Sequence, residues 1–373
     1  MAGAEALVEI RNKTRRLDGL PGFLYTDISG NTAAGIMAAI INNHRPVVGI
    51  TIGDAAGIGP EISLKAAADP DTLLECRPVL IGDRRFLRNT ADKLGIDIEL
   101  TEFSPANATA AGAVEVFYAG ILPQQIAIGV DNAVSGKASA ECIETAVKLC
   151  QAGSIDAIAT APISKKAISL GGYNYPGHTE FLAELTGTKD FAMSFFADQL
   201  RVVLLSTHLS LRSAIDLVRT DKLVEVIRFA DAQLSALLAR PVRIAVAGLN
   251  PHASEQGMFG DEEAREISPA VDECRGLGID VYGPFSPDTI FLRGYQGEFD
   301  AVVACYHDQA TIAVKSLSFG SSVNVTLGLP IIRTSVDHGT AFDIAGKGTA
   351  DASSMKAAVR LAGELSRIRR PQA

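Results

Sequence analysis

Short apolar runs rich in β-branched residues alternate with stretches of helical periodicity along most of the chain. The apolar runs at residues 47–52, 78–83 and 156–162 predict strands, because buried strands are short and rich in such residues. Apolar residues at helical spacing predict helices at residues 60–69, 84–95, 138–153, 223–239 and 355–368. This alternation predicts an α/β fold with a largely parallel sheet.

Three of the six histidines directly follow other strand-like runs. The run RVVLLST leads to His208, VRIAVAGLNP leads to His252 and DAVVACY leads to His307. Because ligands of open α/β sheets bind outside the carboxyl ends of the strands, we expect the three imidazoles at one edge of the sheet. Imidazole is a common metal ligand, so the pattern predicts one metal site assembled from distant segments. The alternative is three unrelated loop or capping histidines.

The length of the chain indicates more than one lobe. The chain has 373 residues, of which 47% are hydrophobic. Single cores stop growing near about 250–300 residues, so we expect a division into two lobes. We assign residues 46–373 to this two-lobed domain and residues 1–45 to an N-terminal extension of unknown role. Residues 33–41 predict a short amphipathic helix, which is too short to span a bilayer.

Charge and cysteine content exclude several classes of protein. The formal net charge is −9 and there is no basic block, so nucleic acid and membrane surfaces are not expected partners. An anionic substrate would need a local positive pocket. The five cysteines form no CxxC motif and no disulfide framework, and the first residues are no signal peptide. We therefore expect a cytoplasmic protein.

The segment GDAAGIGPE (residues 53–61) follows the first predicted strand and opens a helix. Glycine lets a ligand approach the backbone closely, and a helix N-terminus favours anions. The segment is not a Rossmann fingerprint, because Ile62 stands where GxGxxG needs its third glycine, and it is not a P-loop. Asp54 is the ionisable group of the turn and a candidate for orienting a ligand or moving a proton. The alternative is a purely structural turn.

The segment YPGHTEF (residues 175–181) places His178 and Thr179 at a predicted helix start. His178 lies outside the strand-end pattern, so we interpret it as a substrate contact rather than a metal ligand. Thr179 is either a second contact or the cap of the helix.

Residues 306–348 contain most of the remaining polar chemistry. Lys315 and Arg333, with Asn324 between them, suit a phosphate or a carboxylate. A further apolar run is followed by four neighbouring candidates: Asp337, His338, Gly339 and Thr340. The alternative is a solvated loop, but so much polar chemistry in an apolar stretch favours a site.

These motifs stand in the order typical of one family. They are GDAAGIGPE, APISK, YPGHTEFLAELTG, STHLSLR, GLNPHASE, GPFSPDT, YHDQ and VNVTLGLPIIRTSVDHGTAFDIAGKGTAD. From about residue 47 to its end, the sequence resembles the 4-hydroxythreonine-4-phosphate dehydrogenase (PdxA) family. The resemblance does not cover residues 1–45.

The resemblance implies a fold like that of isocitrate and isopropylmalate dehydrogenases, with two α/β lobes and a cleft between them, and not a Rossmann fold. It implies a homodimer with active sites at the subunit boundary and metal ligands from both chains. The family's metal histidines correspond to His208, His252 and His307. Its substrate contacts correspond to His178, Thr179, Lys315, Asn324 and Arg333. We assign cofactor contacts to Asp337, His338, Gly339 and Thr340.

The expected reaction is the NAD-dependent oxidation of a 4-phosphorylated 3-hydroxy acid, followed by loss of CO₂. The family implies the 4-hydroxythreonine-4-phosphate dehydrogenase of pyridoxal phosphate biosynthesis, and NADP is the other candidate cofactor. A divalent metal (zinc, magnesium or cobalt) would hold the substrate hydroxyl as a Lewis acid. Asp54, Asp308 and Lys315 are the candidates for moving the proton.

Several departures from the family pattern surround the expected substrate pocket. Ala55, Ala310 and Ser322 replace the residues usual at these positions, and residues 311–313 are also unusual. The GDAAG turn resembles that of a subgroup of the family, which implies a different substrate, D-threonate or D-erythronate 4-phosphate of sugar-acid catabolism. The same residues also fit a metal-dependent hydrolase, since three histidines suit a zinc-hydroxide site, and a non-catalytic sugar-phosphate sensor.

Overall fold

The computed structural model describes residues 45–105, 112–318 and 320–369. The predicted N-terminal extension lies outside the described residues except for its last residue, and its short helix lies wholly outside them. Both stay predictions. All five cysteines are free. Among the described residues, no helix is both long enough and apolar enough to cross a membrane.

The strands of the described chain form one mixed sheet. In chain order they are β1 (Val47–Thr51), β2 (Arg77–Gly82), β3 (Glu99–Glu102), β4 (Ala113–Tyr118), β5 (Ala157–Thr160), β6 (Ala192–Ala197), β7 (Leu200–Leu204), β8 (Ile244–Ala247), β9 (Val281–Phe285), β10 (Ala301–Ala304), β11 (Val323–Leu327) and β12 (Ile332–Ser335). Their order in the sheet is β3-β4-β2-β1-β5-β12-β11-β6-β7-β10-β8-β9. Only β11 with β12, β11 with β6, and β6 with β7 pair antiparallel within the described sheet. The predicted α/β class with a largely parallel sheet is confirmed.

Helices lie in most of the connections between the strands. They are α3 (Gly59–Ala67), α4 (Pro70–Glu75), α5 (Arg84–Leu94), α6 (Ala133–Gln151), α7 (Lys165–Leu170), α8 (His178–Thr186), α9 (Leu211–Asp216), α10 (Thr220–Leu238), α11 (Ser268–Gly276), α12 (Pro287–Tyr295), α13 (His307–Leu317) and α14 (Ser353–Arg369). Two short turns of other helix types are η1 (Pro251–Glu255) and η2 (Glu263–Ile267).

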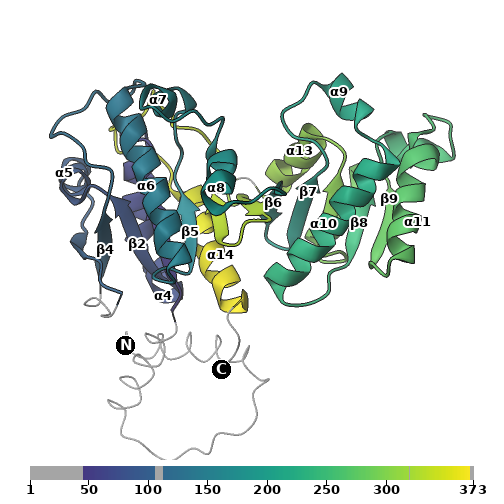
Figure 1. Ribbon diagram of the computed structural model, residues 1–373, viewed down its shortest axis with the longest axis horizontal. Coiled ribbons are helices and arrows are strands. Elements are labelled where there is room, and N and C mark those ends of the chain that lie inside the picture. Colours follow the sequence, from purple (N-terminus) through teal and green to yellow (C-terminus); the bar gives the residue numbers. More distant parts are fainter. Residues whose placement is uncertain (1–44, 106–111, 319, 370–373) are drawn as a thin grey trace, which may run out of the picture. The chain divides into compact units, whose positions relative to one another are not determined.

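The sheet has two halves that meet where β11 pairs with β12. The chain builds the first half through β5, crosses to the second half, and returns through β12. It ends in α14, drawn in yellow, which packs on β5 and β12 of the first half (Figure 1). The pairing of Asn324 with Ser335, and of Val325 with Thr334, joins the halves. Residues far apart in sequence are thereby brought to this junction.

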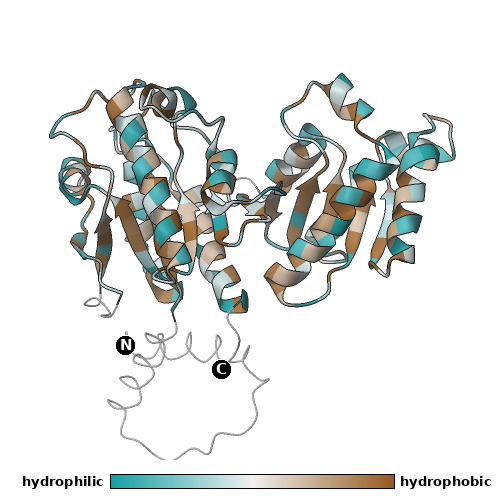
Figure 2. Cartoon of the chain, in the orientation of Figure 1, coloured by the Kyte–Doolittle hydropathy of each residue, from teal (hydrophilic) through white to brown (hydrophobic). Residues whose placement is uncertain are grey.

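The core lies along the strands, which are covered by helices. β5, β8, β10 and β12 are buried along their whole length. Figure 2 shows hydrophobic strands and helices that carry hydrophilic residues. Parallel strands covered on both faces are usually apolar along most of their length, which explains why the sequence shows apolar runs rather than alternation. β12, with the buried Arg333, is an exception.

Two predicted helices begin earlier than their apolar periodicity indicates. α6 begins at Ala133 because the Asn132 side chain accepts a hydrogen bond from the Ser135 N–H at 2.8 Å. α10 begins at Thr220, whose N–H donates to the Glu266 carboxylate at 2.9 Å. In both helices the contact that fixes the first turn is polar, so apolar spacing does not reveal it.

Candidate active site

The three strands that lead to the predicted metal histidines are neighbours in the sheet. β10 lies between β7 and β8 and pairs with both in parallel. His208 follows β7, His307 begins α13 after β10, and His252 lies in η1 after β8. The carboxyl ends of these strands therefore meet at one edge of the sheet, as the sequence predicts.

Two of these histidines lie together. The ring centroids of His208 and His307 are 5.7 Å apart, and both residues line a cavity of 520 Å³. Nδ1 of His307 lies 2.8 Å from Oδ1 of Asp308, which leaves Nε2 for a ligand. A carboxylate on the other ring nitrogen is usual beside metal-binding histidines, because it fixes the tautomer and the ring orientation. The pair therefore fits part of a metal-ligand set.

His252 does not join this pair and does not line the cavity. Its exposed ring lies 6.4 Å from that of Phe259, and its Nδ1 lies 3.9 Å from the Asp288 carboxylate. The backbone is left-handed at five successive non-glycine residues, His252 to Gln256, with φ of 55, 52, 71, 43 and 60°. This conformation costs roughly 1–2 kcal/mol per residue, so other contacts must hold the turn.

One chain therefore does not bring the three predicted metal ligands together. The described residues contain no group of three or more His, Cys, Asp or Glu side chains that could hold a metal ion. His208 and His307 supply two imidazoles, and a three-histidine site would need His252 from a second subunit. The three-histidine site stays a prediction. Because the rings of His208 and His307 lie together in one chain, these two would act from the same subunit.

The cavity beside His208 and His307 lies where the two halves of the sheet meet. Its walls come from the start of α8, from α13, from β6, β11 and β12, and from the loops after β5, β7 and β12. It brings together all five predicted substrate contacts and three of the four predicted cofactor contacts: His178, Thr179, Lys315, Asn324, Arg333, Asp337, His338 and Gly339.

Arg333 is the buried cation of the cavity, with 2% of its surface exposed. Its Nε and Nη2 donate to Oγ1 of Thr160 at 3.2 and 2.8 Å, and its Nη1 donates to Oγ1 of Thr326 at 2.9 Å. Burial lowers the pKa of Arg333 to about 9, although the charge of Glu180 opposes the shift, so the guanidinium stays protonated at neutral pH. A charged side chain held by neutral hydroxyls is suited to an anionic ligand.

Three buried polar atoms of cavity residues have no hydrogen-bond partner in the described protein: Nε2 of His178, Oδ1 of Asn324 and Nε2 of His338. Buried polar groups are nearly always paired, so each indicates a ligand contact. Burial and the nearby charge of Arg333 lower the pKa of His178 well below its usual value, so the ring is neutral at pH 7. The cap of α8 is Gly177, so the alternative of Thr179 as the helix cap is wrong.

Helix α13 presents a stripe of polar residues to the cavity. His307, Thr311 and Lys315 follow at intervals of four and all line it, because residues four apart share one face of a helix. Among the described residues, Lys315 has no ion-pair or hydrogen-bond partner. The stripe therefore places a free cation and a hydroxyl beside His307.

The loop of residues 336–348 begins at the cavity. Asp337 accepts hydrogen bonds from Oγ of Ser322 at 2.8 Å and from Oγ of Ser354 at 3.3 Å. Nε2 of His338 is buried without a partner in the described chain. Asp337 is thus fixed by hydroxyls, whereas His338 keeps one nitrogen for a ligand.

The rest of this loop is fixed to the first helix. The Thr340 carbonyl accepts from the Ile58 N–H at 3.0 Å. The Glu61 carboxylate accepts from the N–H groups of Gly348 at 3.2 Å and Ala350 at 2.9 Å. A second cavity, of 440 Å³, lies beside this end and is lined by residues from the first turn, α5, the segment before α6, and Ala345 and Gly346. The loop therefore borders a cavity at each end.

Comparison with known proteins agrees with the motifs. The family model "Pyridoxal phosphate biosynthetic protein PdxA" matches residues 74–362. The D-threonate 4-phosphate dehydrogenase of Salmonella typhimurium is 45% identical over 323 residues, which cover 86% of this chain and 98% of that relative. The chain belongs to the PdxA family.

Other PdxA relatives are named for a different substrate. The 4-hydroxythreonine-4-phosphate dehydrogenase of Geobacter metallireducens is 44% identical over 330 residues, 88% of this chain and 97% of that relative. A crystal structure of 4-hydroxythreonine-4-phosphate dehydrogenase from Klebsiella pneumoniae has 42% identity and a TM-score of 0.79, and it covers 86% of this chain and 99% of its own. The resemblance stated from the motifs is confirmed, and the fold is that of PdxA dehydrogenases.

The structure separates the three predicted proton-moving residues of this PdxA chain. Asp54 is fully buried, and it lines neither of these two cavities. Burial raises the pKa of Asp54, although the hydrogen bond from the Ala56 N–H at 2.8 Å opposes the shift. Asp308 does not line the 520 Å³ cavity either and contacts His307. Lys315 is the candidate that lines the cavity.

The sequence did not single out two further residues of the cavity. Lys165 and Glu180 both line the cavity, and both lie inside PdxA motifs, APISK and GHTEF. Their local sequence is that of an ordinary helix start, so only their place in the motifs could have indicated a function. Ser322, a departure from the family pattern, contacts Asp337 and does not line the cavity.

Proposed function

We propose that this chain is a cytoplasmic, homodimeric dehydrogenase that oxidises D-threonate 4-phosphate with NAD. The observation that carries the proposal is the 520 Å³ cavity, which gathers every predicted substrate contact beside a pair of histidines. D-threonate 4-phosphate is preferred because several relatives at 44–45% identity, among them that of Salmonella typhimurium, are named for that substrate. The GDAAG turn favours the same subgroup.

The cavity suits a substrate with two anionic groups. Lys315 and the buried Arg333 supply cations in a chain of net charge −9. The N-terminus of α8 opens into the same space, and its cap, Gly177, provides no side-chain acceptor. Free N–H groups at a helix N-terminus favour phosphate and carboxylate groups. We assign the phosphate and the carboxylate of the substrate to these three positive elements.

The neutral polar groups suit the hydroxyls of the substrate. The uncharged ring of His178 and the amide of Asn324 each have a buried atom that lacks a partner in the described chain. The hydroxyl of Thr311 lies between His307 and Lys315 on α13. A site built to hydrogen-bond hydroxyls discriminates strongly against analogues that lack them, because its buried polar groups would be left unpaired.

We assign the metal to His208 and His307 of one chain and to His252 of the partner subunit. A bound zinc, magnesium or cobalt ion would supply Lewis acidity at the substrate hydroxyl that loses its proton. Asp308 orients His307 through Nδ1. Lys315 lies on the same face of α13, two helical turns from His307. Its protonated form can bind an anion, whereas only its neutral amine form can accept the hydroxyl proton.

We assign NAD to the loop of residues 336–348, with NADP as the alternative. Asp337 and His338 border the 520 Å³ cavity, while Ala345 and Gly346 border the second cavity. An extended dinucleotide could therefore contact both ends of one loop. When bound, it would accept the hydride that leaves the hydroxyl-bearing carbon. The resulting 3-oxo acid loses CO₂, because its carbonyl accepts the electron pair left behind.

The experiment is a screen of NADH formation with D-threonate, D-erythronate and 4-hydroxythreonine 4-phosphates, with and without added metal. We expect the highest kcat/KM with D-threonate 4-phosphate. A clear preference for 4-hydroxythreonine 4-phosphate, the name carried by the Geobacter metallireducens relative, would establish the second candidate. Release of inorganic phosphate without NADH would establish a hydrolase. Binding without turnover of any of the three compounds would establish a sensor.

A further inference from the structure

The π-helical turn η2 holds the segment that leads to His252. Its first residue, Glu263, has a side chain that is 3% exposed. Oε1 of Glu263 accepts from the N–H groups of Leu249 at 2.8 Å and Asn250 at 2.7 Å, and Oε2 accepts from Nδ2 of Asn250 at 2.9 Å. The carboxylate thus contacts the backbone where β8 ends and the left-handed turn begins.

The left-handed turn is packed directly against these groups. A Cβ at Gly248 would lie 3.0 Å from Ala253 and 3.2 Å from Oε1 of Glu263. Within the turn, the Ser254 hydroxyl donates to the Gly260 carbonyl. Five successive non-glycine residues in a disfavoured conformation persist only where the surroundings determine them. The Glu263 carboxylate is the buried charged group among those surroundings.

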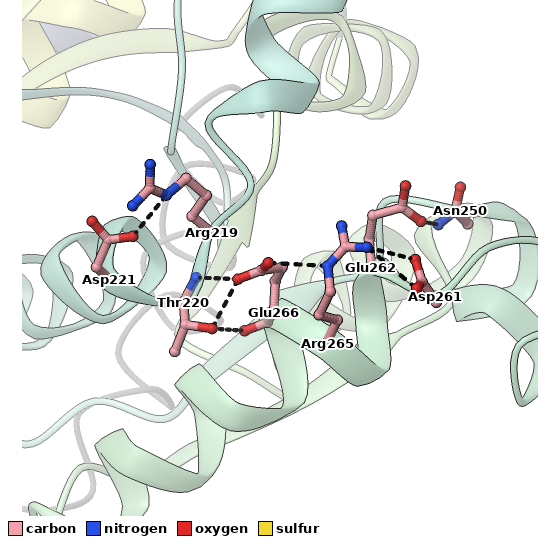
Figure 3. A network of polar contacts seen from close by, with 8 residues as sticks. All are labelled: Arg219, Thr220, Asp221, Asn250, Asp261, Glu262, Arg265 and Glu266. Atoms are coloured by element: carbon pink, nitrogen blue, oxygen red, sulfur yellow. Dashed lines mark hydrogen bonds and ion pairs between the residues drawn. The ribbon is translucent and has the colours of Figure 1, made fainter.

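The neighbouring carboxylate, Glu266, holds a different segment. Figure 3 shows Glu266 accepting from the N–H of Thr220 at 2.9 Å and from its Oγ1 at 3.0 Å. Arg265 joins Glu266 to Asp261 in the same network. The hydrogen bonds of Glu266 run to the start of α10 and not to residues 249–257, so it provides a matched carboxylate on the same helical turn.

We propose that Glu263 is a positioning residue whose buried carboxylate fixes the start of the left-handed turn and thereby the place of His252. The proposal rests on the proposed function of His252 as a metal ligand. Glu263→Gln preserves the size of the side chain but turns one accepting oxygen into an N–H₂ donor. That donor would face either the backbone N–H groups or the Asn250 amide donor, so at least one present contact must be lost.

The first measurement is amide hydrogen exchange of the full-length, metal-free protein. Glu263→Gln is expected to accelerate exchange in residues 249–257 by about tenfold or more, because local opening frees these amides. Glu266→Gln should accelerate exchange at the start of α10 and leave residues 249–257 unchanged. Asn250→Ala, which removes only side-chain contacts, should give a smaller acceleration in 249–257 and covers the case in which Glu263→Gln does not fold. If exchange in residues 249–257 is unchanged in both Glu263→Gln and Asn250→Ala, the proposal is overturned.

The second measurement is Co²⁺ affinity, followed by the visible absorption of the bound ion. Loss of a group that orients a ligand typically weakens metal binding about 10–100-fold, and we expect this for Glu263→Gln but not for Glu266→Gln. If His252→Ala loses Co²⁺ affinity and Glu263→Gln keeps it, the positioning role is overturned. If His252→Ala binds Co²⁺ like the wild type, the proposed metal role of His252 fails instead, and the exchange measurement alone decides the role of Glu263.

Discussion

His208 and His307 place their imidazole ring centroids 5.7 Å apart, although they follow different strands of the sheet. His252, after the neighbouring strand β8, is directed elsewhere by its left-handed turn. Because two of the histidines lie together and the third lies apart, a metal site that uses all three would have to be assembled from two chains. His208 and His307 would act together from one chain, and His252 would act in the site of the partner.

The first prediction tests this division by mixing inactive variants. Co-refolded His208→Ala and His252→Ala should recover about a quarter of wild-type activity, because random pairing gives half heterodimers, each with one intact site of two. Co-refolded His208→Ala and His307→Ala should recover none, because these two residues belong to the same half-site. The measurement is NADH formation by each mixture against each variant alone. Recovery in the second mixture instead of the first would contradict the assignment.

The second prediction concerns Lys315, a cation of the cavity that has no partner among the described residues. Lys315→Met should raise KM for the phosphorylated substrate by a factor of roughly ten to a hundred, since a lost charged hydrogen bond costs ~1.5–3 kcal/mol. KM for NAD should change little. Lys137→Met is the matched control, because Lys137 lies exposed on α6 and, in the part of the chain that the structure describes, forms an ion pair only with Glu141, at 3.8 Å. Steady-state kinetics with each substrate varied in turn gives both values. Equal effects of the two substitutions would remove Lys315 from the site.

The edge of the sheet at which the candidate site lies could be predicted from the sequence, because each histidine stands next to its own strand in the sequence. An apolar run followed by a histidine places that histidine at a strand end without knowledge of its neighbours. The parallel pairing of β10 with β7 and β8 then confirmed that His208, His252 and His307 reach the same edge. Arg333 and Asn324 were found in the same way, as polar residues in an apolar stretch.

The turn at His252 could not be predicted in this way. The residues from His252 to Gln256 include no glycine, so nothing in the local sequence indicates a left-handed backbone. Just before the turn, the N–H groups of Leu249 and Asn250 donate to the Glu263 carboxylate. Glu263 comes later in the sequence and reaches these groups only in the folded chain. The role of Asp54 stays a prediction: the residue is fully buried and lines neither cavity, while its Oδ2 has no hydrogen-bond partner among the described residues.

The third prediction concerns the contact between the first turn and the cofactor loop. A Cβ at Gly57 would lie 2.8 Å from the Thr340 carbonyl oxygen, so Gly57→Ala must shift the loop of residues 336–348 relative to the first turn. We expect KM for NAD to rise several-fold and KM for the phosphorylated substrate to change less. Gly276→Ala on α11 is the control, because its added Cβ would meet no atom within 4 Å. A larger rise in KM for the phosphorylated substrate than for NAD would contradict the assignment of the loop.

The fourth prediction is a pH dependence of stability at the contact between α4 and α14. The side chain of Asp69 is 12% exposed and pairs with Lys356 at 2.5 Å and Arg360 at 2.9 Å. Although desolvation opposes the shift, the hydrogen bonds from Lys356, Thr72 and Arg360 lower the pKa of Asp69 from 3.8 to about 2. A carboxyl group with a lowered pKa stabilises the folded state above its unfolded pKa, and this stabilisation is lost as pH falls through the folded pKa.

Asp69→Asn should therefore lower the free energy of unfolding by about 1–2 kcal/mol at pH 7, and the difference from the wild type should shrink between pH 4 and pH 2. Asparagine is as good a helix N-cap as aspartate, so the cap of α4 is kept while the charge is removed. Asp71→Asn is the matched control, because Asp71 is 71% exposed and an exposed ion pair contributes little. Urea unfolding of the three proteins at a series of pH values measures the effect. A deficit of Asp69→Asn that stayed constant down to pH 2 would show that the ion pairs of Asp69 do not stabilise the fold.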